Sequence, residues 1–337
     1  MKSITINTLK NNTEPLIEGI EKYSICPSKE EAKKIFWGLG DQFWMQVIEF
    51  HEYGPMVFDE GLHKGPKEPG FFDSLRQGCL FASEHLCERL SVSFYKELHE
   101  KLCAHFKGKV NSTEIEAWQT GQFRSKMTTC SPSINSLSKE AHEHYANVYI
   151  YECEMLMEFL RDKEYAKYQK IREEYQKSKK WCQEWEEKWD EKLFLVDAYL
   201  SEKCKELSLS KFTKIFKSDL SIYIAYDCAE PEMHEMIIQK LFDDYHSKMD
   251  QLQGSREEIL HEKIKIIAHL FQMLEWLHPF PDGQGRTDLV LLSKLLSEEG
   301  LNPPILEQPY FSTWSLLPEW QDYLLKGIHL WQKKKPS

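Results

Sequence analysis

The chain has 337 residues, of which 41% are hydrophobic and 29% are charged. This composition is typical of a folded protein with a sizeable core and excludes an intrinsically disordered chain. The formal net charge is −11, and the densest basic run outside helices is Lys333-Lys334-Lys335, so we expect no binding to nucleic acid.

The cysteine pattern points to a reducing compartment. The nine cysteines are odd in number and form no Cys-x-x-Cys pair, which argues against a disulfide framework or a zinc ribbon. We expect no secretory signal, because Met1 to Asn12 lacks a basic start followed by an apolar stretch. No apolar span long enough for a membrane helix occurs. The sequence predicts a cytoplasmic protein, and translocation into a host cell as an effector stays open.

Apolar residues recur at helical spacing over most of the chain, so the fold class is mainly α. A Gly- and Pro-rich stretch from Gly61 to Phe71 predicts a long loop. Helices are expected after it, near Asp73 to Glu88 and Ser91 to Phe106.

Long, highly charged helices are expected over residues 137–207. Trp181, Trp185 and Trp189 recur every four residues there and share one helix face. This stripe packs against a neighbouring helix, or it forms a partner-binding face on an inserted helical hairpin at about residues 155–205.

Two segments have the alternation of a strand. From Asp219 to Asp227, apolar residues alternate with others in a period of two. The alternation from Gln122 to Thr129 is weaker. The two segments belong to separate hairpins or to one small sheet.

A buried central helix is expected from Ile264 to Leu277, which is apolar nearly all round. A loop with two prolines and two glycines follows. A second helix with leucines at helical spacing then extends to Gly300.

The loop between these helices has the features of an anion site. Asp282-Gly283-Gln284-Gly285 opens directly onto a helix, so main-chain N–H groups and the positive helix end converge there. Nearby, His278 is a candidate general base, Asp282 a candidate metal ligand and Arg286 a cation for phosphate.

This stretch resembles the signature of the Fic family, His-x-Phe-x-Asp/Glu-Gly-Asn-Gly-Arg-x-x-Arg. The matching fixed positions are His278, Phe280, Asp282, Gly283, Gly285 and Arg286. A weaker echo, Glu97-Leu98-His99 and Gly121-Gln122-Phe123-Arg124, indicates that the Fic-like region begins ahead of the insertion. We expect an N-terminal helical region at 1–110 and a Fic-like core at 111–337.

The resemblance implies a transferase that modifies a protein hydroxyl, with AMP from ATP as the family default. It assigns deprotonation of the hydroxyl to His278 and binding of Mg²⁺ to Asp282. Gly283, Gln284 and Gly285 would line the anion hole, and Arg286 would hold a phosphate of the leaving group. Phe280 would fix the loop in the core.

The resemblance also implies a β-hairpin flap that pairs with an extended target segment. Asp219 to Asp227 is the leading candidate for this flap, and Gln122 to Thr129 competes with it.

Two positions depart from the signature. Gln284 replaces Asn, and Leu289 replaces the closing Arg, which contacts the terminal phosphate of ATP in the family. The loss of that Arg penalises ATP most and leaves a diphosphate-linked nucleotide donor as an alternative. Gln284 and Leu289 together leave a binding protein without turnover as a second alternative. Removal of a modification is a third, because the geometry that adds a phosphoryl group can also reverse the transfer. Arg124 is a candidate substitute for the missing cation. Autoinhibition by Glu18 is not expected, because its Arg partner is absent.

Overall fold

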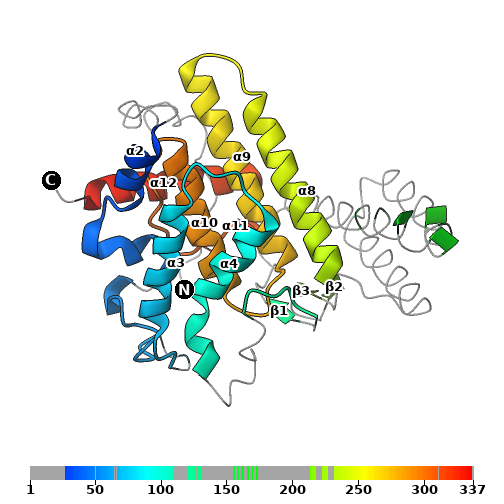
Figure 1. Ribbon diagram of the computed structural model, residues 1–337, viewed down its shortest axis with the longest axis horizontal. Helices are drawn as coiled ribbons and strands as arrows, with labels where there is room; N and C mark the ends of the chain where they lie inside the picture. Colours follow the sequence, from blue (N-terminus) through cyan, green and yellow to red (C-terminus); the bar gives the residue numbers. More distant parts are fainter. Residues whose placement is uncertain are drawn as a thin grey trace.

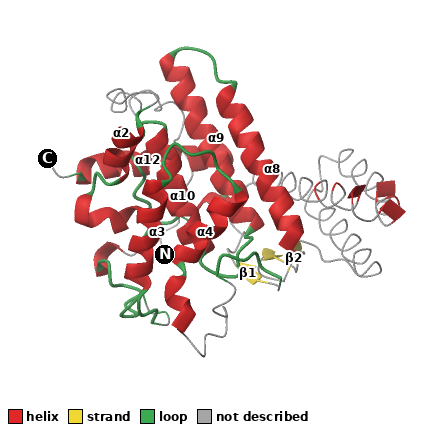
Figure 2. Ribbon diagram, viewed as in Figure 1, coloured by secondary structure: helices red, strands yellow, loops and turns green. Residues whose placement is uncertain are grey.

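The computed structural model describes residues 27–49, 51–63, 65, 67–108, 120–125, 128–130, 213–217, 222–226, 231–309 and 311–335, with scattered positions between 155 and 173. This part is mainly helical (Figure 1, Figure 2). Most of the predicted hairpin at residues 155–205, including Trp181, Trp185 and Trp189, lies outside the described residues.

Among the described residues, the helices before the small sheet are α2 (Lys29–Phe36), α3 (Phe71–Glu84) and α4 (Val92–Leu102), with 3-10 turns η1 (Gly40–Gln46), η2 (His51–Tyr53) and η3 (Ala104–Gly108). Those after it are α8 (Pro231–Asp250), α9 (Arg256–Leu277), α10 (Gln284–Glu298), α11 (Phe311–Trp314) and α12 (Leu317–Lys334). The predicted helices flanking the signature loop are confirmed as α9 and α10.

Helices α9 and α10 form the centre of the bundle. Helix α9 packs against α8, α10, α11 and α12, while α10 also contacts α2, α3 and α4 (Figure 1). Buried hydrophobic residues from Ala32 to Trp331 belong to one cluster. The described N-terminal helices therefore share a core with α8 to α12, and the division of the chain near residue 110 stays a prediction.

Local sequence determines where α9 begins and ends. Ser255 caps its first turn by accepting from the Glu258 N–H, and the Glu258 carboxylate accepts from the Ser255 N–H at 2.9 Å. The helix ends at His278, which has φ 42° and ψ 56°. This left-handed conformation breaks the helical repeat and turns the chain into the signature loop.

The strands form one antiparallel sheet in the order β1-β3-β2, with β1 (Thr128–Cys130), β2 (Thr213–Lys217) and β3 (Ile222–Tyr226). Thr128 pairs with Tyr226 on one side of β3, and Thr213 pairs with the same residue on the other. Strand β3 lies within the predicted segment Asp219 to Asp227 and pairs with β1. Of the segment Gln122 to Thr129, only Thr128 and Thr129 belong to β1, and residues 122–125 form no strand. Strand β2 was not predicted, because its apolar residues Ile215 and Phe216 are adjacent and do not alternate with polar ones.

None of the helices among the described residues has the length and apolarity needed to cross a lipid bilayer.

Candidate functional site

The backbone that follows His278 is held by the segment at residues 120–125. Arg124 Nε donates to the His278 carbonyl at 2.7 Å, and the Arg124 N–H donates to the Pro279 carbonyl at 2.8 Å. The guanidinium thus serves carbonyls that the end of α9 leaves without helical partners. Arg124, from the weaker sequence echo, therefore lies against the signature loop.

The surroundings of His278 keep its imidazole unprotonated in this structure. Burial, together with the positive charge of Arg124, lowers the pKa of its imidazole to about 3. The ring is therefore neutral at physiological pH. Because a bound anion would favour the protonated ring, the pKa of His278 should rise towards neutrality when a phosphate donor is present.

Phe280 fixes the loop in the core. Its side chain is fully buried, and its ring lies face to face with His99 of α4, with centroids 3.8 Å apart. The rings of Tyr95 and Phe123 also pack against it at 5.0 and 5.2 Å. The loop therefore has a fixed position relative to α4.

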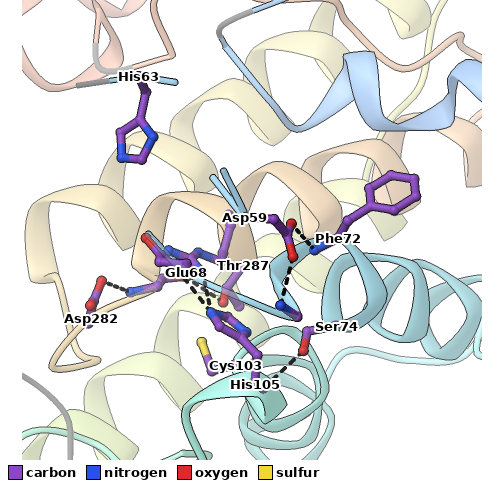
Figure 3. Close-up of polar contacts among 12 residues, drawn as sticks. Asp59, His63, Glu68, Phe72, Ser74, Cys103, His105, Asp282 and Thr287 are labelled. Atoms are coloured by element: carbon purple, nitrogen blue, oxygen red, sulfur yellow. Dashed lines mark hydrogen bonds and ion pairs between the residues drawn. The ribbon is translucent and has the colours of Figure 1, made fainter. Parts of the chain in front are cut away.

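Asp282, which is labelled in Figure 3, and Gly283 shape the start of α10. The Asp282 carboxylate accepts from the Gly283 N–H at 2.5 Å, and the Asp282 carbonyl lies 2.8 Å from His99 Nε2. Gly283 has φ 72°, and a Cβ there would come within 2.4 Å of Cys103 Sγ. Glycine is therefore required by both the backbone conformation and the contact.

The carboxylate of Asp282 fits the magnesium site that the signature implies. It is partly exposed beside the helix N-terminus. Among the described residues, no group of three or more His, Cys, Asp or Glu side chains is arranged to hold a metal. Mg²⁺ commonly binds through one carboxylate together with substrate phosphates and water, so a single carboxylate such as that of Asp282 would be enough to hold it.

The N-terminus of α10 offers main-chain donors to an anion. The helix's own bonds begin with the Thr287 N–H, which donates to the Gly283 carbonyl at 3.1 Å. The N–H groups of Gln284, Gly285 and Arg286 precede that bond and have no acceptor within the helix. These three groups form the candidate anion hole.

The side chain of Gln284 is turned into the core. Its Nε2 donates to the Tyr95 hydroxyl and to Asp288 Oδ2, both at 2.6 Å. Its Oε1 accepts from the Phe280 N–H at 3.2 Å. The amide thus braces the loop from behind, and Gln284 presents its main-chain N–H rather than its side chain to the anion hole.

Arg286 is held by groups from the N-terminal part of the chain, of which Glu68 and His105 are labelled in Figure 3. Its Nη1 donates to Glu68 Oε2 at 3.1 Å, and His105 Nε2 lies 3.1 Å from the same oxygen. The guanidinium lies 4.7 Å from the Phe71 ring centroid. Burial would raise the pKa of Glu68, but the hydrogen bond from His105 and the charge of Arg286 lower it to about 2.

Comparison with protein families agrees with this geometry. Residues 197–296 match the model of the Fic/DOC family. This segment of the chain is a Fic/DOC domain.

Two relatives share parts of the chain. The phosphocholine transferase AnkX of Legionella pneumophila is 38% identical over 78 residues, which cover 22% of this chain and 8% of AnkX. A protein of Ostreid herpesvirus 1 named ribonucleoside-diphosphate reductase small chain is 30% identical over 103 residues, 31% of this chain and 17% of that protein. The chain spans less than a fifth of either relative.

Two positions bear on whether another cation replaces the closing Arg of the signature. Leu289 is 5% exposed and packs in the core. Arg124 donates to main-chain carbonyls at the end of α9. The predicted substitute for the missing Arg is therefore already bonded to the backbone.

A buried acid pair lies behind the Fic loop and was not found by sequence reading. Asp288 accepts from the Tyr95 hydroxyl at 2.5 Å. Burial raises the pKa of Asp288 to about 7, and burial together with the charge of Asp288 raises the pKa of Glu275. The two carboxyls therefore retain a proton between them. No sequence signal links Tyr95 to this pair, because Tyr95 belongs to a helix almost two hundred residues before Asp288 in the chain.

Proposed function

We propose that the chain is a Fic-type transferase that moves a phosphate-containing group onto a hydroxyl of a target protein. The observation that carries this proposal is the placement of His278 and Asp282 on either side of a loop whose main-chain N–H groups converge at the start of α10. A neutral base, a carboxylate and an anion hole are the parts that phosphoryl transfer by positioning and charge neutralisation requires.

The reaction follows from these parts. His278 takes the proton of the target hydroxyl, and the oxygen then forms a bond to a phosphorus of the donor. The bond from that phosphorus to its leaving oxygen breaks, and the leaving phosphate takes the negative charge. Mg²⁺ on Asp282 would neutralise charge on the phosphates when bound. The anion hole and Arg286 hold the phosphates in line for this displacement.

The donor that we favour is a nucleotide joined through a diphosphate to a second group, such as CDP-choline. Leu289 supplies no charge for the terminal phosphate of ATP, and Arg286 is paired with Glu68. The similarity to a phosphocholine transferase supports this choice. With such a donor, the transferred group is phosphocholine and the leaving group is a nucleoside monophosphate. AMP transfer from ATP is the competing candidate, because it is the family default.

The target segment is proposed to add to the sheet β1-β3-β2 by strand pairing. Strand β3 already pairs with β1 through Ile224 to Tyr226 and with β2 along its whole length. A target strand would therefore join β1 or β2. Strand β3, which lies within the predicted flap at residues 219–227, would then be the central strand of the docking sheet.

The test is mass spectrometry of a target-cell lysate treated with the protein, Mg²⁺ and either ATP or CDP-choline. His278→Ala is the control. We expect a phosphocholine adduct on one or a few proteins, absent with the variant. An AMP adduct would identify ATP as the donor. If neither donor gives an adduct, the result would indicate a binding protein without turnover. Loss of a pre-formed adduct would indicate an enzyme that removes the modification.

A further inference from the structure

The loop that contains Glu68 is held in place by bonds of its own. Asp59 accepts from the Gly70 N–H at 2.7 Å and from the Phe72 N–H at 3.0 Å (Figure 3). The Glu68 N–H donates to the Phe58 carbonyl at 2.9 Å. The position of the Glu68 carboxylate is therefore set by the fold and does not depend on Arg286 alone.

The charges around Arg286 do not favour a highly charged donor. Glu68 and Asp282 are the carboxylates whose charges act on its guanidinium. Glu68 is 14% exposed and remains charged, since its pKa is about 2. One cation thus faces two carboxylates, and Mg²⁺ on Asp282 would offset only the second of them.

We propose that Glu68 determines donor specificity by neutralising Arg286, so that the site selects a diphosphate diester over a triphosphate. This inference rests on the proposed function and concerns the donor of that same site. A terminal phosphate carries about −1.5 to −2 charges at pH 7, whereas each phosphate of a diphosphate diester carries one. The paired guanidinium attracts both donors, but the Glu68 carboxylate repels the triphosphate more strongly.

The experiment measures donor binding by calorimetry with Mg²⁺ in a His278→Ala background, which prevents turnover. Glu68→Gln keeps the shape of the side chain and its contacts with Arg286 and His105 but removes its charge. We expect ATP to bind about tenfold more tightly, the factor that corresponds to about 1.4 kcal/mol. The affinity for CDP-choline should change by less than about threefold, because that donor has no terminal phosphate.

Glu60→Gln is the matched control. It changes the net charge equally, from an exposed position in the same part of the chain. We expect it to leave both affinities unchanged. Glu68→Asp keeps the charge and should keep the preference for CDP-choline. Thermal unfolding of every variant separates an effect on binding from loss of the fold.

Three results would overturn the proposal. The first is an equal change for ATP and CDP-choline in Glu68→Gln, which would show that the carboxylate only positions Arg286. The second is an increase in ATP affinity in Glu60→Gln as large as that in Glu68→Gln. The third is loss of binding of both donors in a folded Glu68→Gln protein. If neither donor binds even when Glu68 is intact, the proposed function fails, and the inference fails with it.

Discussion

The ring of His99 lies flat on that of Phe280, with centroids 3.8 Å apart and planes 8° from parallel. The same imidazole joins two segments distant in sequence. Its Nε2 lies 2.8 Å from the Asp282 carbonyl, and its Nδ1 accepts from the Gly121 N–H at 2.9 Å. With Nδ1 accepting, the proton is on Nε2, so a single neutral tautomer makes both bonds.

Replacing His99 should therefore disturb the loop and the fold together. We expect His99→Ala to lower kcat/KM at least tenfold and to reduce the free energy of unfolding by about 2 to 4 kcal/mol. His99→Gln offers one donor and one acceptor and should recover much of the activity. Steady-state kinetics and urea unfolding measure both effects. Equal activity in the Ala and Gln variants would contradict the role of the two hydrogen bonds.

The lowered pKa of His99 should make the stability of the fold depend on pH. Burial lowers the pKa of His99 to about 4, below its ordinary 6.5. Between pH 6.5 and 4, His99 binds a proton more tightly in the unfolded chain than in the folded one. The stability that the neutral ring contributes is therefore fully present above pH 6.5 and is lost as the pH falls towards 4. The expected loss is about 3 kcal/mol. Urea unfolding from pH 7 to 4 should show a shallower decline in His99→Gln than in the unmodified chain. Parallel declines would refute the assignment.

Tyr95→Phe tests the bonds behind Gln284. The substitution removes the hydroxyl that donates to Asp288 and accepts from Gln284. Leaving these buried groups with fewer partners should cost about 1 to 3 kcal/mol of stability. Activity should fall with it, because Gln284 also holds the Phe280 N–H. Thermal unfolding and turnover measure the two effects, and Tyr323→Phe is a control at a half-buried tyrosine far from the loop in sequence. An unchanged melting temperature would count against the network.

Asp282→Ala tests the magnesium site. Removing the carboxylate should abolish the effect of Mg²⁺ on donor binding, since Asp282 is the proposed protein ligand. In the presence of Mg²⁺, the donor should bind at least tenfold more weakly than it does to the unmodified chain. Calorimetry with and without Mg²⁺ measures this, with Asp41→Ala as a control on the protein surface. If donor affinity stays high and Mg²⁺ still strengthens it, another residue holds the ion.

Leu289→Arg tests whether the missing signature Arg can be restored. The leucine is 5% exposed, so the new guanidinium is partly buried and should lower the melting temperature by about 4 °C or more. ATP should raise the melting temperature of this variant more than that of the unmodified chain, because the terminal phosphate gives the guanidinium a partner. Leu289→Met is the control of similar volume. Equal shifts with ATP would show that the new side chain does not reach the donor.

The sequence predicted the parts of this molecule that depend on local pattern. Helices α9 and α10 follow from apolar periodicity, and the loop follows from glycines next to His278 and Asp282. The family match at residues 197–296 confirms that resemblance. The pairing of Arg286 with Glu68 was not predictable, because it joins residues more than two hundred positions apart. The inward turn of Gln284 depends in the same way on Tyr95, which only the packing of α4 brings to the loop.

The close approach of Gly283 and Cys103 restricts how these two positions can change in evolution. The Cys103 sulfur occupies the space that a side chain at position 283 would need, 2.4 Å from its first carbon. Mutational drift at the two sites is therefore coupled: a lineage that gains alanine at position 283 must first, or at the same time, acquire a smaller residue at 103. Paired substitutions of this kind should appear when diverging sequences are compared, and Gly283→Ala should be tolerated better together with Cys103→Gly than alone.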